Sequence, residues 1–141
     1  MNVRALCSPF AALALALGLC AAPGLAHADD PFKVVVSAPT AKVGEAAVAK
    51  VTITPAAGYH MNKDFPTSLK LTPTKGVEVP AKLAKSDGSV KVEEAAATFD
   101  VKYTASEKGP RTVVGQLSFA VCTATNCDPR KAPVTLNLDV K

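Results

Sequence analysis

Two cysteines near the end of the chain are the residues best suited to chemistry. Cys122 and Cys127 are separated by four residues, so a disulfide between them would close a small local ring. The chain-entropy model gives a ring of this size about 2 kcal/mol of stabilisation, against about 5 kcal/mol for a loop of about a hundred residues. Three uses of the pair stay open on this spacing: thiol–disulfide exchange, a structural staple and a metal site.

Residues 1–28 have the pattern of a cleaved secretory signal peptide. Arg4 precedes an apolar run that Pro23 helps to break, and the triplet 26–28 (Ala-His-Ala) fits the small-x-small rule for cleavage. A less favoured alternative is a lipoprotein signal in which Cys20 would be acylated. Residues 29–141 are then expected to form one domain.

Removal of residues 1–28 changes the cysteine inventory. Cys7 and Cys20 leave with the signal peptide, and Cys122 and Cys127 remain as an even pair in an exported chain. Exported compartments permit disulfides, so we expect the pair to be oxidised at rest. We expect a soluble, monomeric periplasmic protein.

His60 and its two neighbours form a second group of interest. His60 could act as proton donor or thiolate partner for the cysteines, since its pKa suits either task, and Tyr59 is a candidate auxiliary residue beside it. His60 and Met61 also join the cysteines as copper-type ligands, but blue-copper sites normally use two histidines and residues 29–141 contain one. We therefore expect no metal and no cofactor, with a copper-binding protein as the minor alternative.

The rest of the chain is dominated by strand patterns. Alternating apolar and polar residues, bounded by Gly and Pro, recur along the chain without a convincing helix, although residues 93–97 could form one helical turn. Residues 113, 115, 117, 119 and 121 share one face, and the alternation is clearest in the last strand, where residues 134, 136, 138 and 140 point one way. The candidate strands cover residues 33–36, 47–54, 59–62, 69–72, 77–79, 97–104, 113–121 and 134–141.

These strands predict an all-β protein, an immunoglobulin-like antiparallel β-sandwich in which two sheets share one core. In such a fold Cys122 is expected either on the face opposite to Val121 or at the exit of that strand. Cys127 is expected in a turn marked by Asn126 and Pro129, before a last strand that begins near Pro133. Both thiols would then lie in one connection at the edge of the sandwich, where loops commonly carry function.

The charge is modest. The chain has 16 basic and 12 acidic residues, and of these only Arg4 lies in residues 1–28, which leaves +3 on residues 29–141. The lysines are scattered and Trp is absent, so the sequence gives little support to nucleic-acid binding. No Ser-His-Asp pattern or phosphate loop is found.

From about Gly58 to Val140 the chain resembles the N-terminal periplasmic domain of the DsbD family of thiol:disulfide interchange proteins. Three segments carry the resemblance. They are Gly58-Tyr59-His60-Met61-Asn62, the segment from Cys122 to Pro129 (Cys-Thr-Ala-Thr-Asn-Cys-Asp-Pro), and the closing strand Val134 to Val140. The cysteine segment is the most specific of the three.

The resemblance implies a redox relay. A membrane-embedded thiol reductant domain would reduce the pair, and the sandwich would pass the electrons to periplasmic thioredoxin-like or disulfide proteins. By the same resemblance Cys127 forms the mixed disulfide with partners and Cys122 resolves it.

Two departures from the family pattern concern access and the electron source. Many members shield the pair with an aromatic cap loop, whereas the corresponding stretch, residues 84–92, has no aromatic residue. The sequence also carries neither the membrane domain nor the thioredoxin-like domain of full-length DsbD. We therefore expect a separate protein to supply electrons.

Overall fold

The computed structural model describes residues 30–141, so the predicted signal peptide, Cys20 and the predicted cleavage site lie outside the described residues. Within 30–141 no helix is long and apolar enough to cross a membrane. The described chain is built of β-strands and one short 3-10 turn, η1. The elements are β1 (Phe32–Ser37), β2 (Ala46–Pro55), β3 (His60–Met61), β4 (Ser68–Leu71), β5 (Val77–Glu78), β6 (Lys82–Ala84), η1 (Lys85–Asp87), β7 (Val90–Val92), β8 (Ala97–Ala105), β9 (Gly109–Cys122) and β10 (Cys127–Val140).

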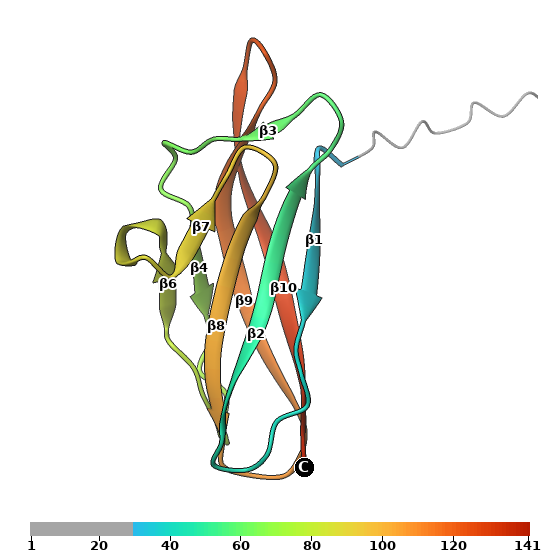
Figure 1. Cartoon of the computed structure of the whole chain (residues 1–141), viewed down its shortest axis with the longest axis vertical. Helices are drawn as coiled ribbons and strands as arrows, with labels where there is room; N and C mark the ends of the chain where they lie inside the picture. The colour runs from blue at the N-terminus through green and yellow to red at the C-terminus, as the bar shows by residue number, and fades with distance from the viewer. Residues whose placement is uncertain (1–29) are drawn as a thin grey trace, which may run out of the picture.

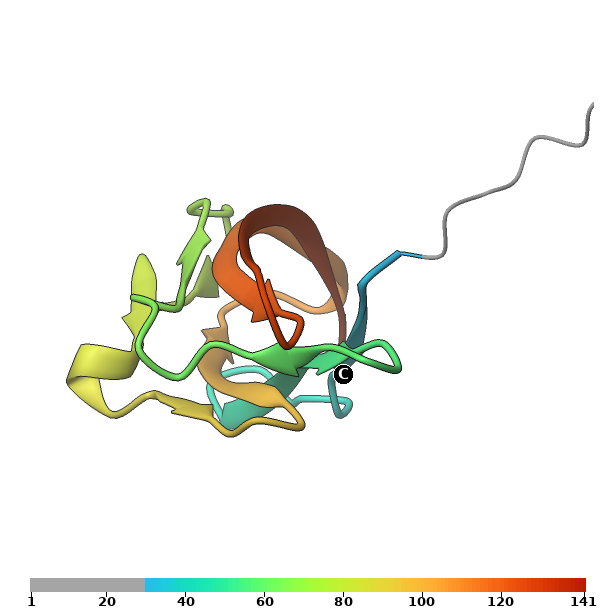
Figure 2. The same cartoon turned by 90° about the horizontal axis from the view of Figure 1, so that it is seen from above.

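The strands form two antiparallel sheets (Figure 1). The first sheet has the order β1-β2-β8-β5, with β7 also paired to β8, and the second has the order β10-β9-β4-β6, with β3 paired to β9. Seen from above, the sheets enclose a common interior, and β3 crosses the end of the sandwich between the β9–β10 hairpin and the β7–β8 turn (Figure 2). The prediction of an all-β, immunoglobulin-like antiparallel β-sandwich is confirmed.

The core follows from period-two alternation along the long strands. Odd-numbered residues of β8 and β9 face inward, and even-numbered residues of β10 face them. Phe119 of β9 meets Phe32 of β1 edge to face, with ring centroids 4.8 Å apart, which joins the two sheets. Fully buried side chains include Val51, Ile53, Leu69, Phe99, Val101, Val113, Leu117, Phe119, Val121 and Leu136.

The β9–β10 hairpin differs from the prediction. The last strand begins at Cys127 and not near Pro133, so the connection between the strands shrinks to the four residues 123–126. β10 is the edge strand of its sheet. At odd-numbered positions of β10, which include Pro129 and Pro133, the backbone faces the free edge of the sheet. No N–H is needed there for pairing with β9, so the two prolines do not break the strand.

The weak helical candidate in the sequence is not formed, and one short helical turn occurs elsewhere in the described chain. Residues 93–97 do not form a helical turn, because Glu93 N–H donates to the Ala96 carbonyl in the tight β7–β8 connection. The helical turn that does occur is η1. Gly88 ends η1 with a φ of 75°, a left-handed conformation that glycine adopts without steric cost.

Candidate functional site

Cys122 and Cys127 form a disulfide that joins the last residue of β9 to the first residue of β10. Their Cα atoms are 4.0 Å apart and lie directly opposite each other in the ladder. Thr123 N–H donates to the Asn126 carbonyl at 2.8 Å, which makes the cysteines a non-hydrogen-bonded pair, the kind whose side chains come closest. The register of the hairpin therefore brings the two sulfurs together.

The hairpin tip beyond the disulfide is a compact four-residue turn. The Thr123 hydroxyl oxygen accepts the N–H of Asn126 at 3.2 Å and that of Thr125 at 3.4 Å. The tip projects beyond the body of the sandwich (Figure 1). The disulfide thus lies at the base of a protruding hairpin.

β3 occupies the other side of Cys122. His60 pairs with Cys122 and Met61 with Val121 in antiparallel register. Residues directly opposite in a ladder share a face, so His60, Cys122 and Cys127 lie in one row on the outer face of three adjacent strands. Met61 points into the core with only 1% of its surface exposed.

A turn after β3 lies beside the disulfide. The Asn62 side-chain oxygen accepts the N–H of Asp64 at 2.9 Å and that of Phe65 at 3.2 Å, an Asx turn. Asn62 N–H in turn donates to the Ala120 carbonyl of β9 at 2.9 Å. Asn62 therefore shapes this turn with its side chain and joins it to the strand that carries Cys122 with its backbone N–H.

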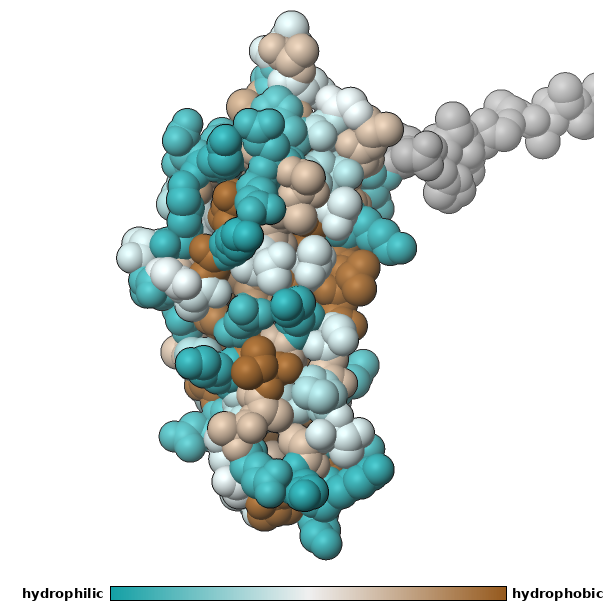
Figure 3. Space-filling view, in the orientation of Figure 1, coloured by the Kyte–Doolittle hydropathy of each residue, from teal (hydrophilic) through white to brown (hydrophobic). Residues whose placement is uncertain are grey.

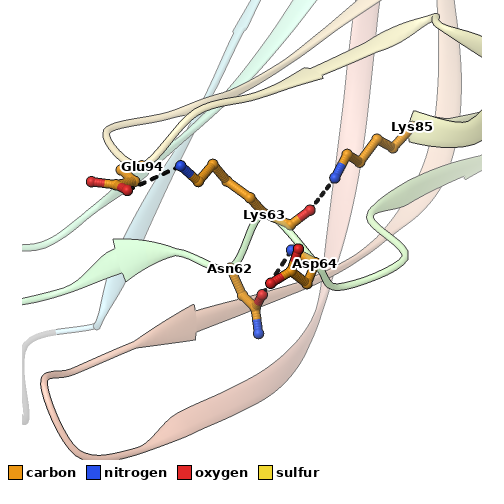
Figure 4. Close-up of polar contacts among 5 residues, drawn as sticks. All are labelled: Asn62, Lys63, Asp64, Lys85 and Glu94. Carbon is orange, nitrogen blue, oxygen red and sulfur yellow. Dashed lines mark hydrogen bonds and ion pairs between the residues drawn. The ribbon is translucent and has the colours of Figure 1, made fainter.

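Two lysines hold the same turn from outside (Figure 4). Lys63 pairs with Glu94 at 3.0 Å, and Lys85 Nζ donates to the Lys63 carbonyl. Met61 N–H adds a backbone bond to the Glu94 carbonyl at 2.9 Å. These contacts connect the turn to β6–η1 and to the β7–β8 connection of the opposite sheet.

The two cysteines differ sharply in exposure. Cys122 is 2% exposed, whereas Cys127 is exposed to solvent. A hollow of about 300 Å³ lies at the pair, lined by His60, Met61, Asn62, Lys63, Asp64, Glu94, Cys122 and Cys127. Attack from solvent therefore meets one sulfur far more readily than the other.

Charges near the site are mostly neutralised in pairs. The Lys63 ammonium, through its hydrogen bond and charge, lowers the pKa of the Glu94 carboxyl below its usual value, with a smaller contribution from His60. Arg130 forms an ion pair with Asp128, and both side chains leave β10 on the face opposite to Cys127. In the space-filling view the apolar groups are small and separated by hydrophilic ones (Figure 3).

The structure brings together some of the predicted residues and not others. His60, Cys122 and Cys127 line one hollow, and Asp64 lies there with them. Tyr59 is 39% exposed and lies outside the lining. The 84–92 segment, expected at the position of a cap, also lies outside the lining, and its Lys85 donates to the Lys63 carbonyl.

Sequence reasoning missed three residues of the site: Asn62, Lys63 and Glu94. Asn62 carried a detectable signal, because Asn two residues before Asp and three before Phe-Pro is typical of an Asx turn. Glu94 carries no local signal of its role. Its partnership with Lys63 joins residues 31 positions apart, which local patterns do not reveal.

Comparison with known proteins gives distant likenesses. No protein-family model and no curated protein matches the chain. Among solved structures, it is similar to AggA, the major subunit of aggregative adherence fimbriae type I from Escherichia coli, with a TM-score of 0.39 and 11% identity over 78% of this chain and 95% of that one. It is also similar to PapD-like domain 7 of human CEP192, with a TM-score of 0.36 and 11% identity over 94% and 96%. Neither likeness bears on what the chain does.

Proposed function

We propose that this protein exchanges thiols and disulfides through Cys122 and Cys127, as the N-terminal domain of the DsbD family does. The observation that supports this most is the unequal exposure of the two cysteines at a sheet edge. A disulfide that only staples a fold gains nothing from one accessible sulfur. A relay needs one, because rates of exchange depend on access to the attacked sulfur.

The strand order favours attack on Cys127. A thiolate approaches a disulfide sulfur along the sulfur–sulfur axis, from the side opposite to the leaving sulfur. For Cys127 that side is the free edge of β10, whereas for Cys122 it is occupied by His60 on β3. The partner's sulfur therefore joins Cys127, and Cys122 leaves as the thiolate.

The exchange balances with a dithiol donor. One donor thiolate attacks Cys127 Sγ, the sulfur–sulfur bond breaks, and Cys122 takes the electron pair and then a proton. The donor's second thiolate attacks its own sulfur in the mixed disulfide and releases Cys127, so the protein gains two electrons and two protons. His60 lies beside Cys122 in the ladder and can supply the proton to the leaving thiolate.

Substrate reduction runs the same steps in reverse. The Cys127 thiolate attacks a partner disulfide, and Cys122 then resolves the mixed disulfide from its position across the hairpin. The proposed donor is a membrane-embedded thiol reductant, and the proposed acceptors are periplasmic thioredoxin-like or disulfide proteins. Export to the periplasm, by way of the signal peptide at residues 1–28, is part of the same proposal.

A trapping variant tests the proposal. Cys122→Ser leaves Cys127 without its resolving partner, so incubation with an oxidised thioredoxin-like protein should accumulate a mixed disulfide that is visible on non-reducing gels. Cys122→Ala repeats the test without a buried hydroxyl.

Cys127→Ser is the matched control. Its remaining thiol is shielded, so it should trap almost nothing. Equal trapping by the Cys122→Ser and Cys127→Ser variants, or none by either, would favour a structural disulfide in a β-sandwich scaffold.

A further inference from the structure

The row of side chains on the outer face has a second chemical use when the disulfide is open. Cys122 lies between His60 on β3 and Cys127 on β10, each directly opposite it in register. All three line the same hollow. Opening the bond therefore leaves two thiols and one imidazole converging on a single site.

The spacing of the row suits a bound ion. The cysteine Cα atoms are 4.0 Å apart, and the His60–Cys122 pair is of the hydrogen-bonded kind, for which a Cα separation of about 5.5 Å is usual. Metal–sulfur bonds of about 2.3 Å and metal–nitrogen bonds of about 2.0 Å are spanned from such positions by short side-chain rotations. Cys127 and His60 are both exposed, so an ion can enter from solvent.

We propose that the dithiol form is a copper(I) site with Cys122, Cys127 and His60 as ligands. Two thiolates and one imidazole form a soft donor set, which favours Cu(I). A structural zinc site would normally require a fourth protein ligand. Two carboxylates line the same hollow, Asp64 and Glu94, and of these Glu94 is engaged with Lys63 at 3.0 Å.

Redox state controls the site. Within residues 30–141 no group of three His, Cys, Asp or Glu side chains is placed to hold a metal while the disulfide is closed. A dithiol reductant delivers two electrons and two protons to the sulfurs, and Cu(I) then displaces both protons as it binds. Oxidation of the pair to the disulfide would release the ion.

The ligand set excludes Met61. Met61 has a copper-type sulfur and adjoins His60, but its side chain faces the core and is 1% exposed. The burial of Met61 therefore distinguishes the proposed three-ligand site from nonspecific binding of copper by any sulfur-bearing residue nearby. It also supplies a matched control, because Met61→Leu conserves volume in the core.

Competition with a chromophoric Cu(I) chelator, bicinchoninate, tests the site on the full-length mature protein under anaerobic conditions. The reduced protein should take one Cu(I) per chain from the chelator, and the disulfide form none. His60→Ala should weaken binding about tenfold or more, whereas Met61→Leu should leave it unchanged.

Three results would overturn the proposal: equal binding by the disulfide form, unchanged affinity in His60→Ala, or a loss in Met61→Leu as large as that in His60→Ala. The result of this copper-binding test can be distinguished from a test of the proposed thiol–disulfide exchange. If the dithiol exchanges with protein partners but His60 adds nothing to its copper affinity, only this inference is refuted. If the dithiol binds copper but never exchanges with protein partners, only the proposed function is refuted.

Discussion

Cys127→Ser separates a disulfide that carries electrons from one that holds the fold together. Cys127 is exposed and serine nearly matches its shape, so the change opens no cavity and buries no new polar group. What it removes is the constraint of a ring of about six residues, worth about 2 kcal/mol in the chain-entropy model. The hairpin ladder from Asp128 onward remains to hold β9 and β10 in register.

Equilibrium urea unfolding followed by circular dichroism measures this loss. With a urea dependence of about 1–3 kcal/mol per molar, the midpoint should fall by about 1 M. Wild-type protein kept reduced should unfold at nearly the same midpoint, since it lacks the same ring. Ala124→Ser, an exposed change at the hairpin tip, is the control and should stay within about 0.5 kcal/mol of wild type.

Failure of Cys127→Ser to fold, or a loss well above about 3 kcal/mol, would refute the reasoning. Either result would mean that the bond fixes the hairpin and β3 together, beyond the entropy of its own ring. A reduced wild type that is unfolded at 25 °C would lead to the same conclusion. Such a disulfide could not cycle in a relay.

Three other outcomes are expected. Tyr103→Phe removes a hydroxyl that donates to the Pro39 carbonyl at 2.8 Å, and should lower the free energy of unfolding by about 1–2 kcal/mol in urea titration; wild-type stability would contradict it. Gly115→Ala would place a Cβ 2.6 Å from a backbone carbonyl oxygen of β4, so it should cost about 1–3 kcal/mol by the same assay, and a neutral effect would contradict that close approach. Lys63→Met should raise the lowered pKa of Glu94 towards its ordinary value in a carboxyl NMR titration. In wild type the contribution of this ion pair to folding stability is present above pH 4.5 and is lost as the pH falls through the lowered pKa of Glu94. An unchanged Glu94 titration in Lys63→Met would exclude Lys63 as the cause of the lowered pKa.

The inward faces of the long strands could be predicted from sequence. Val113, Leu117, Phe119 and Val121 lie on the odd-numbered positions of one strand and are all fully buried, because a period of two is a local property of a strand with one face on the core. The same alternation predicted Cys122 on the opposite face or at the exit of the strand, and in the structure it is the last residue of β9 on the outer face. It did not reveal that Cys122 is buried there.

The burial of Cys122 depends on contacts that no local pattern encodes. β3 reaches it from 62 positions earlier in the chain, and the Asn62 turn follows from there. The start of β10 was missed for a related reason. Pro129 indicates a turn unless the strand is known to lie at the edge of its sheet, where proline is tolerated. Whether a strand lies at an edge depends on the order of strands in the sheet, which the local sequence does not show.

The central claim is that the Cys122–Cys127 bond opens readily in the folded protein. Equilibration of the native protein in glutathione redox buffers, with the dithiol fraction counted by alkylation and mass spectrometry, measures this directly. A reduction potential well above about −300 mV, reached with the fold intact, is the predicted result. A bond that stays closed in every buffer until the sandwich unfolds would contradict the account.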